Sequence, residues 1–167
     1  MGFNKKFFTT GGIVASTPSA PAALDPLRNF ETVTYTGNGG TQKITGYIRK
    51  GAAFNGSSSV INLNNNFNLA NNSFSISFWA ANNSAGESFP IGVVSGTTLN
   101  NGLSIGRPSW STKLDFSFYG NDLLSSTDMA TDGTWQHWVC TYDASTNARK
   151  IYLNGTLDNS DTSAYRS

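Results

Sequence analysis

One stretch near the end of this chain constrains its fold more than any other. The residues from Gly133 to Asp143 read Gly-Thr-Trp-Gln-His-Trp-Val-Cys-Thr-Tyr-Asp, an aromatic-rich run with an alternation of period two. A second run, 149–153, ends at Asn154-Gly155. Asn-Gly is the strongest short-range hairpin signal, because both central residues of a type I′ turn need positive φ. The sequence therefore predicts consecutive antiparallel strands in this part of the chain.

The alternation also predicts which side chains are buried. Trp138, Cys140 and Tyr142 fall on one face of the first strand, because successive side chains of a strand point to opposite faces. Large aromatic side chains favour burial, so we expect this face to point into the core. The opposite face then carries His137, Val139 and Thr141.

The block 133–155 resembles the "W-x-H-v-x-v-x-Y-D … Y-x-N/D-G" signature of laminin-G-like and pentraxin-like jelly rolls, which belong to the concanavalin A-like superfamily. Two earlier segments are similar to this family as well. Gly51–Leu63 resembles its opening "G-x-a-x-F-d-G-x-d-D-y-v", and Phe74–Trp79 resembles its "F-T-i-s-x-W" strand. The resemblance extends over 51–167. It implies a jelly-roll β-sandwich, a scaffold used mostly for binding and adhesion, with enzymes in a minority.

The remaining pattern is also that of strands. Phe74–Trp79 places its apolar side chains on alternate positions, and the segments 103–105 and 114–119 fit middle strands on either side of a loop, Gly106–Trp110. No stretch of useful length has a helical period. The family's closing "G-x-I/L-D-E-v-r-I/V" strand is missing, so we expect the N-terminal strands, a neighbouring subunit or a longer parent chain to complete the sheets.

The N-terminal part of the chain has a different composition. Residues 1–30 contain Pro18, Pro21 and Pro26 in a tract without periodicity, which predicts an extended arm outside the sandwich. We expect this arm to dock on a larger assembly through its apolar side chains, which are Phe3, Phe7, Phe8, Ile13 and Val14. Residues 31–50 predict a β-hairpin, with strands at 32–36 and 41–47 around the turn Gly37-Asn38-Gly39-Gly40.

One segment of this hairpin points to a biological setting. Val33–Gly46, which reads Val-Thr-Tyr-Thr-Gly-Asn-Gly-Gly-Thr-Gln-Lys-Ile-Thr-Gly, resembles a segment recurrent in predicted structural proteins of marine tailed bacteriophages. This resemblance implies that the chain is part of a virion.

Composition argues against several classes of partner. The formal net charge is +1 and only 13% of residues are charged, so the chain lacks the clustered Lys and Arg that attract nucleic acid. A single cysteine, Cys140, cannot form an intrachain disulfide. No segment approaches the run of about 18 apolar residues that spans a bilayer, and the first residues lack the apolar region of a signal peptide. We expect a soluble protein with no nucleic-acid or membrane partner.

Catalytic and metal-binding residues are sparse. The superfamily's glycosidases use carboxylates on alternate residues of one strand, whereas Glu31 and Glu87 are far apart and Asp115 has no acidic neighbour two positions away. The only histidine, His137, matches a structural histidine of the family. The resemblance implies a Ca²⁺ site at the opening loop, but Asn55–Ser59 has neutral oxygens where the family has acids. We therefore expect no enzyme and no cofactor, with weak Ca²⁺ binding as the alternative.

Trp110 and Arg107 lie in the predicted loop between the middle strands, where they could contact a glycan or a partner protein, although Trp110 could equally anchor the loop by packing.

Together these features predict a non-enzymatic virion structural protein of a tailed bacteriophage. Such a protein would decorate the capsid or form a tail appendage (fibre), as a homo-oligomer attached to other virion proteins through the arm. A host surface glycan is its expected ligand. The alternative is a carbohydrate-binding module of a bacterial surface or secreted protein, located on the cell surface or outside the cell.

Overall fold

The computed structural model describes residues 42–45, 50–55, 61, 69, 71–93 and 99–164. Within these residues every regular element is a β-strand, so the predicted all-β class is confirmed. The strands are β1 Gln42–Thr45, β2 Lys50–Ala53, β3 Phe74–Ala80, β4 Ser88–Val93, β5 Leu103–Arg107, β6 Lys113–Phe118, β7 Asp122–Asp128, β8 Gln136–Asp143, β9 Ala148–Leu153 and β10 Thr156–Thr162.

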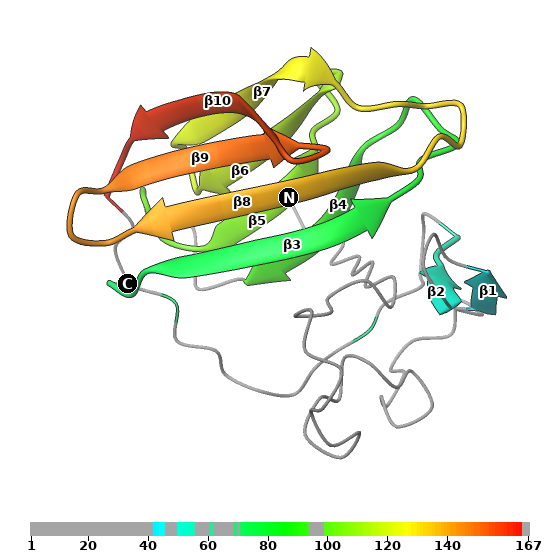
Figure 1. The fold of residues 1–167 in the computed structure, drawn as a ribbon, viewed down its shortest axis with the longest axis horizontal. Helices are drawn as coiled ribbons and strands as arrows, with labels where there is room; N and C mark the ends of the chain where they lie inside the picture. Colours follow the sequence, from blue (N-terminus) through cyan, green and yellow to red (C-terminus); the bar gives the residue numbers. More distant parts are fainter. Residues whose placement is uncertain are drawn as a thin grey trace.

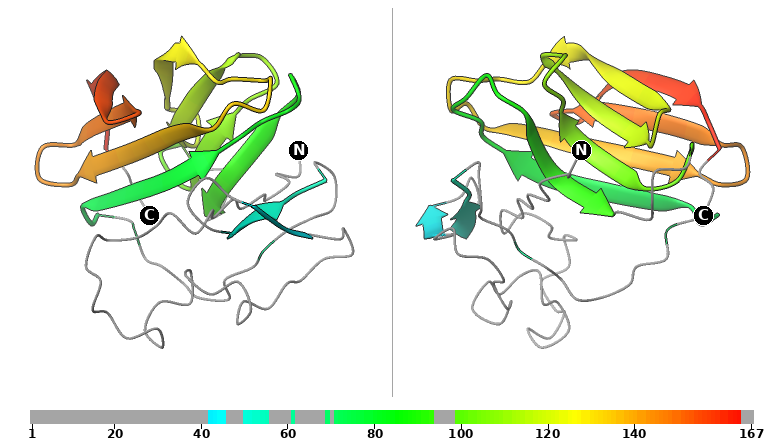
Figure 2. Two further views of the ribbon diagram at one scale, coloured as in Figure 1. Left: turned by 45° about the vertical axis from the view of Figure 1, so that its right-hand side comes forward. Right: turned by 180° about the vertical axis from the view of Figure 1, so that it is seen from behind.

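Two four-stranded antiparallel sheets form a sandwich (Figure 1). The first has the order β10-β9-β8-β3 and faces the viewer in Figure 1; we call it the front sheet. The second, the back sheet, has the order β4-β5-β6-β7 and comes forward when the molecule is turned by 180° (Figure 2). This two-layer arrangement agrees with the predicted jelly-roll sandwich.

The core lies between the two sheets and follows the predicted register. Trp138, Cys140 and Tyr142 all point inward, and Trp138 is fully buried directly opposite Phe78 on β3. The back sheet contributes Leu114, Phe116 and Phe118 of β6, together with Ile91, Leu103, Ile105 and Leu123. Burial in this apolar core raises the pKa of the Cys140 thiol, so Cys140 serves here as a small core residue.

The N-terminal hairpin differs from its prediction. β1 lies within the predicted strand 41–47, but its partner is β2, with Gln42 opposite Ala53 and Thr45 opposite Lys50. The expected partner strand 32–36 and the arm 1–30 lie outside the described residues. Strands β4, β7 and β10 were not predicted. β7 and β10 are rich in polar residues and lack a clear apolar alternation, whereas β4 is mostly apolar but contains Pro90 and Gly92, two residue types that are uncommon inside strands.

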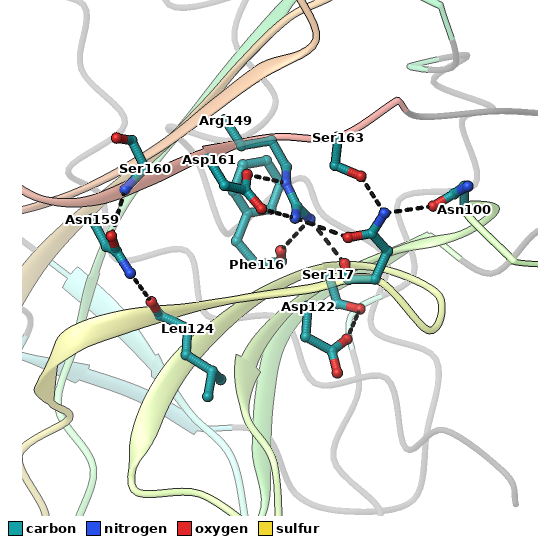
Figure 3. Close-up of polar contacts among 11 residues, drawn as sticks. Asn100, Phe116, Ser117, Asp122, Leu124, Arg149, Asn159, Ser160, Asp161 and Ser163 are labelled. Atoms are coloured by element: carbon teal, nitrogen blue, oxygen red, sulfur yellow. Dashed lines mark hydrogen bonds and ion pairs between the residues drawn. The ribbon is translucent and has the colours of Figure 1, made fainter.

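A buried polar network joins the two sheets (Figure 3). The guanidinium of Arg149 on β9 is fully buried and its five N–H groups all meet acceptors. Nε and Nη2 donate to the two carboxylate oxygens of Asp161 on β10, at 2.8 and 2.5 Å. Nη1 donates to the carbonyls of Phe116 and Asn121, and Nη2 also to Asn121 Oδ1. A single side chain therefore ties β9 and β10 of the front sheet to the β6–β7 hairpin of the back sheet.

Strand β10 also lies along β7, and this contact closes one side of the sandwich (Figure 1). The carboxylate of Asp158 accepts the backbone N–H groups of Ser126 and Thr127, and Asn159 Nδ2 donates to the carbonyl of Leu124 at 2.8 Å. In the described part of the chain, no helix is long and apolar enough to cross a membrane.

Candidate functional site: an aromatic hollow on the front sheet

The outward face of the front sheet contains a hollow of about 400 Å³ at the end where β3 and β9 finish and β8 begins (right-hand end of the sheet in Figure 1). Its lining is Trp79, Trp135, His137, Asn154 and Gly155. The hollow is open to solvent rather than enclosed. Ligand sites combine aromatic walls with a few placed polar groups, and the hollow has both.

The register of two strands brings the first aromatic wall together. Trp79 on β3 lies directly opposite His137 on β8. Their rings stack, with centroids 4.9 Å apart and planes inclined by 26°. Both side chains are partly buried, so each keeps some of its surface open to solvent. Directly opposite side chains of neighbouring antiparallel strands are close enough for such contact, and the pairing fixes the orientation of both rings.

Ser77 fixes the imidazole further. It lies two residues before Trp79 on the same outward face of β3, and its Oγ is 2.8 Å from His137 Nε2. Partial burial lowers the pKa of His137 below its usual value of 6.5. The ring is consequently neutral at pH 7 and offers no positive charge to the hollow.

The β9–β10 turn forms the opposite rim. Asn154 and Gly155 have φ values of 50° and 85°, the positive values that a type I′ turn needs, which confirms the predicted Asn-Gly hairpin turn. Asn154 N donates to the carbonyl of His137 at 2.8 Å, and His137 N donates to Asn154 Oδ1 at 3.0 Å. Because its amide oxygen is used in this way, the Nδ2 group of Asn154 is the end that can donate to a ligand.

The loop before β8 positions Trp135. Gly133 has a φ of 84° and its N–H donates to the carbonyl of Asn82 at 3.0 Å. A Cβ at this glycine would lie 2.5 Å from Asn83 Oδ1, so the turn both needs positive φ and packs closely on the loop after β3. Thr134 N donates to Asp132 Oδ1 at 2.9 Å. These bonds fix the residues immediately before Trp135.

The residues predicted to contact a ligand lie elsewhere. Trp110 is 63% exposed in the β5–β6 loop, which suits the predicted contact, and that contact stays a prediction. Arg107 is the last residue of β5 and only 5% exposed, with Nη1 donating to the carbonyl of Gly86 at 3.0 Å. It is held inside the fold and shares no open surface with Trp110. Neither residue lines the hollow. The predicted docking residues of the arm lie outside the described residues.

The sequence alone did not identify Trp79 and Trp135 as site residues, and it predicts a structural role for His137. The sequence nonetheless contains a signal for the pair of Trp79 and His137. A tryptophan and a histidine on the outward faces of two neighbouring strands can come into contact, and the register of the strands decides whether they do. The pairing of β3 with β8 supplies that register.

The acidic residues form a pair that the sequence did not reveal. Asp115 on β6 has no acidic neighbour two positions away in its own strand, but the β6–β7 hairpin brings Asp122 of β7 close, opposite Ser117. Burial, and then the charge of Asp122, raise the pKa of Asp115 to about 8, against an opposing effect of Arg149. Asp115 is only 4% exposed and its Oδ1 has no hydrogen-bond partner. A substrate cannot reach it in this arrangement.

Metal ligands do not gather in the described part of the chain: it has no group of three or more His, Cys, Asp or Glu side chains that could hold an ion. Of the opening loop, for which the sequence predicts no metal, Gly56–Ser59 lie outside the described residues.

The family assignment rests on one comparison. The model of the concanavalin A-like lectin/glucanase superfamily of laminin-G type matches residues 55–167, which is more than half of the chain. No curated protein and no solved structure matches the chain significantly. The matched region contains β3 to β10 and therefore both sheets and every residue of the hollow. The chain belongs to the concanavalin A-like lectin/glucanase superfamily and carries a laminin-G-type binding domain.

Proposed function

We propose that this chain is a non-enzymatic binding module of a tailed-bacteriophage particle, and that it binds a glycan of the host surface in the aromatic hollow. The observation that carries the proposal is the joint presence of Trp79 and Trp135 around a hollow with polar groups at its rim. Tryptophan offers a large flat apolar face beside a polar edge, which suits the ring face and hydroxyl groups of a sugar.

The composition of the hollow favours binding over hydrolysis. Most glycosidases place two Asp or Glu side chains on either side of the bond that they cleave. None of the five lining residues is acidic. The acid pair of Asp115 and Asp122 belongs to the back sheet, and Asp115 is buried.

The virion setting rests on the N-terminal part of the chain. The similarity of Val33–Gly46 to phage structural proteins and the apolar, proline-containing segment 1–30 support a capsid decoration or tail appendage whose arm holds the binding domain on other virion proteins. Many copies on one particle would raise the overall avidity well above the affinity of one hollow. An assembly of several copies therefore suits a site formed by only a few side chains.

Binding of the full chain to an array of bacterial and algal glycans tests the ligand. We expect signals on a subset of glycans that disappear with Trp135→Ala and persist with Trp110→Ala, which removes the same type of side chain outside the hollow. If Trp110→Ala abolishes the signals and Trp135→Ala does not, the ligand contacts the β5–β6 loop and the hollow is not its site.

A second function, a carbohydrate-binding module of a bacterial surface or secreted protein, would use the same hollow. The two differ in location. Mass spectrometry of purified phage particles distinguishes them, because only the virion protein is found at a fixed copy number per particle.

A further inference from the structure

We infer that the hollow accepts the ring of an uncharged sugar and discriminates against anionic sugars. This inference rests on the proposed glycan ligand and specifies its chemical class. It follows from the charges in and beside the hollow, and from the way that its walls are fixed.

The lining contains no group that would compensate an anion. Proteins bind carboxylate and sulfate groups through Arg, Lys or converging N–H donors, which make charge-assisted hydrogen bonds. Among the five lining residues none is Arg or Lys, and the one side chain that titrates near neutral pH, His137, is held neutral by its partial burial. An acidic sugar entering the hollow would lose hydration without gaining a counter-charge, which is unfavourable.

Two acidic residues, Asp132 and Asp158, lie three positions from the lining residues along the chain. Asp132 is three positions before Trp135, so their Cα atoms are at most about 11 Å apart. Hydrogen bonds from Thr134 lower the pKa of Asp132, which is therefore ionised at neutral pH. At that distance an exposed charge is largely screened, because the Debye length is about 8 Å at physiological ionic strength. Asp132 therefore supplies no counter-charge for a negative sugar and adds only weak repulsion.

The walls are fixed before any ligand arrives. Ser77 and the stacked Trp79 hold the His137 ring, the reciprocal bonds between His137 and Asn154 hold the turn, and the Gly133 turn holds the approach to Trp135. A prearranged site loses little conformational entropy on binding. The neutral hydroxyls of a sugar can bond Asn154 Nδ2 at the rim while the ring packs on indole, so no charge is required for binding.

Affinity gel electrophoresis of the full chain tests this inference. The gels contain neutral polysaccharides (dextran, galactomannan, xylan, laminarin) or anionic ones (alginate, polygalacturonate, carrageenan) at about 150 mM salt. We expect retardation by at least one neutral polysaccharide and by none of the anionic ones. The retardation should be lost in Trp135→Ala and kept in Trp110→Ala. Thermal unfolding of each variant verifies that it is folded, and Trp135→Phe, which keeps an aromatic face, should retain part of the retardation.

The results of this experiment distinguish a wrong class of sugar from a wrong binding site. If anionic polysaccharides alone retard the chain and Trp135→Ala abolishes this, the hollow is a glycan site but the inferred neutral class is wrong. If no polysaccharide retards the chain, or if retardation survives in Trp135→Ala, the proposed glycan site itself is wrong, and the inference is wrong with it.

Discussion

Asp161 receives two hydrogen bonds from Arg149, and this pair connects the last strand of the front sheet to the interior of the sandwich. Arg149 is fully buried, whereas the Asp161 side chain is about a third exposed. The guanidinium also lies over the rings of Phe116 and Phe118, with distances of 5.7 and 5.0 Å to their centroids. Its charge is therefore compensated by one carboxylate, two aromatic faces and the acceptors of the β6–β7 hairpin.

Removing the carboxylate should be costly. In Asp161→Ala the guanidinium of Arg149 stays buried without its counter-charge, and breaking a buried pair in this way destabilises a protein by roughly 3–5 kcal/mol. Because Asp161 is partly exposed, we expect the lower end, about 3 kcal/mol, in guanidinium-chloride unfolding. Lys150→Ala, on the exposed neighbour of Arg149, serves as control and should change stability little. Equal effects of the two variants would contradict the structural role of the pair.

The raised pKa of Asp115 predicts that the free energy of unfolding falls as pH rises. Its pKa is raised from 3.8 to about 8 in the folded chain, so the folded state binds a proton that the unfolded state releases. The folded state is thus penalised progressively from about pH 4 up to about pH 8, and the penalty is constant above that. Asp115→Asn should be more stable than the parent by a few kcal/mol at pH 8.5, on the order of the shift, and by little at pH 4. If the denaturation midpoints of Asp115→Asn and of the parent chain differ by the same amount at both pH values, the pKa of Asp115 is not raised.

The protonation of His137 should make ligand binding depend on pH in the acidic range. Its pKa lies below the usual 6.5, so the ring becomes protonated only in acid. A bound sugar would then cover a charged ring beside Trp79 and remove part of its hydration, which is unfavourable. Affinity for a neutral sugar should therefore be nearly constant from pH 8 to 7 and fall in acid. His137→Gln should remove this acid dependence, as measured by titration calorimetry. A loss of affinity that begins above pH 7 would show that another group is responsible.

The register of β8 can be tested at its largest side chain. Trp138 has no exposed surface, and its buried Nε1 has no hydrogen-bond partner. Trp138→Ala should cost about 3–5 kcal/mol through the lost transfer energy and the remaining cavity. Trp138→Phe should cost clearly less, because it keeps an aromatic ring and removes the unsatisfied N–H group. An unchanged melting temperature of Trp138→Ala would mean that the opposite face of β8 is the inward one.

The proposed role of the N-terminal arm is testable by deletion. A chain of residues 31–167 should fold with the melting temperature of the full chain but should fail to join phage particles, because segment 1–30 is proposed as the anchor. Quantification of the protein in purified particles measures this. Normal incorporation of the shortened chain, or its failure to fold, would contradict the proposal.

The sequence predicted those parts of the fold that carry their own signal. The alternation in β8 and the Asn154-Gly155 turn identified two strands and the inward face. Strands β7 and β10 gave no such signal. They stabilise each other through long-range contacts, because Asp158 and Asn159 of β10 form hydrogen bonds with the backbone of β7, and such contacts leave no pattern in the local sequence. The hollow could not be predicted for a related reason, since Trp79 and His137 become neighbours only through the pairing of β3 with β8.

The hollow on the front sheet is the proposed ligand site. The four tryptophans of the chain test it in one experiment, because each indole N–H gives its own signal in a ¹⁵N–¹H correlation spectrum. On titration with a neutral oligosaccharide from a polysaccharide that retards the chain, the signals of Trp79 and Trp135 should shift. Those of buried Trp138 and of exposed Trp110 should stay in place. A shift of the Trp110 signal, with Trp79 and Trp135 unmoved, would show that the ligand binds at the β5–β6 loop and not in the hollow.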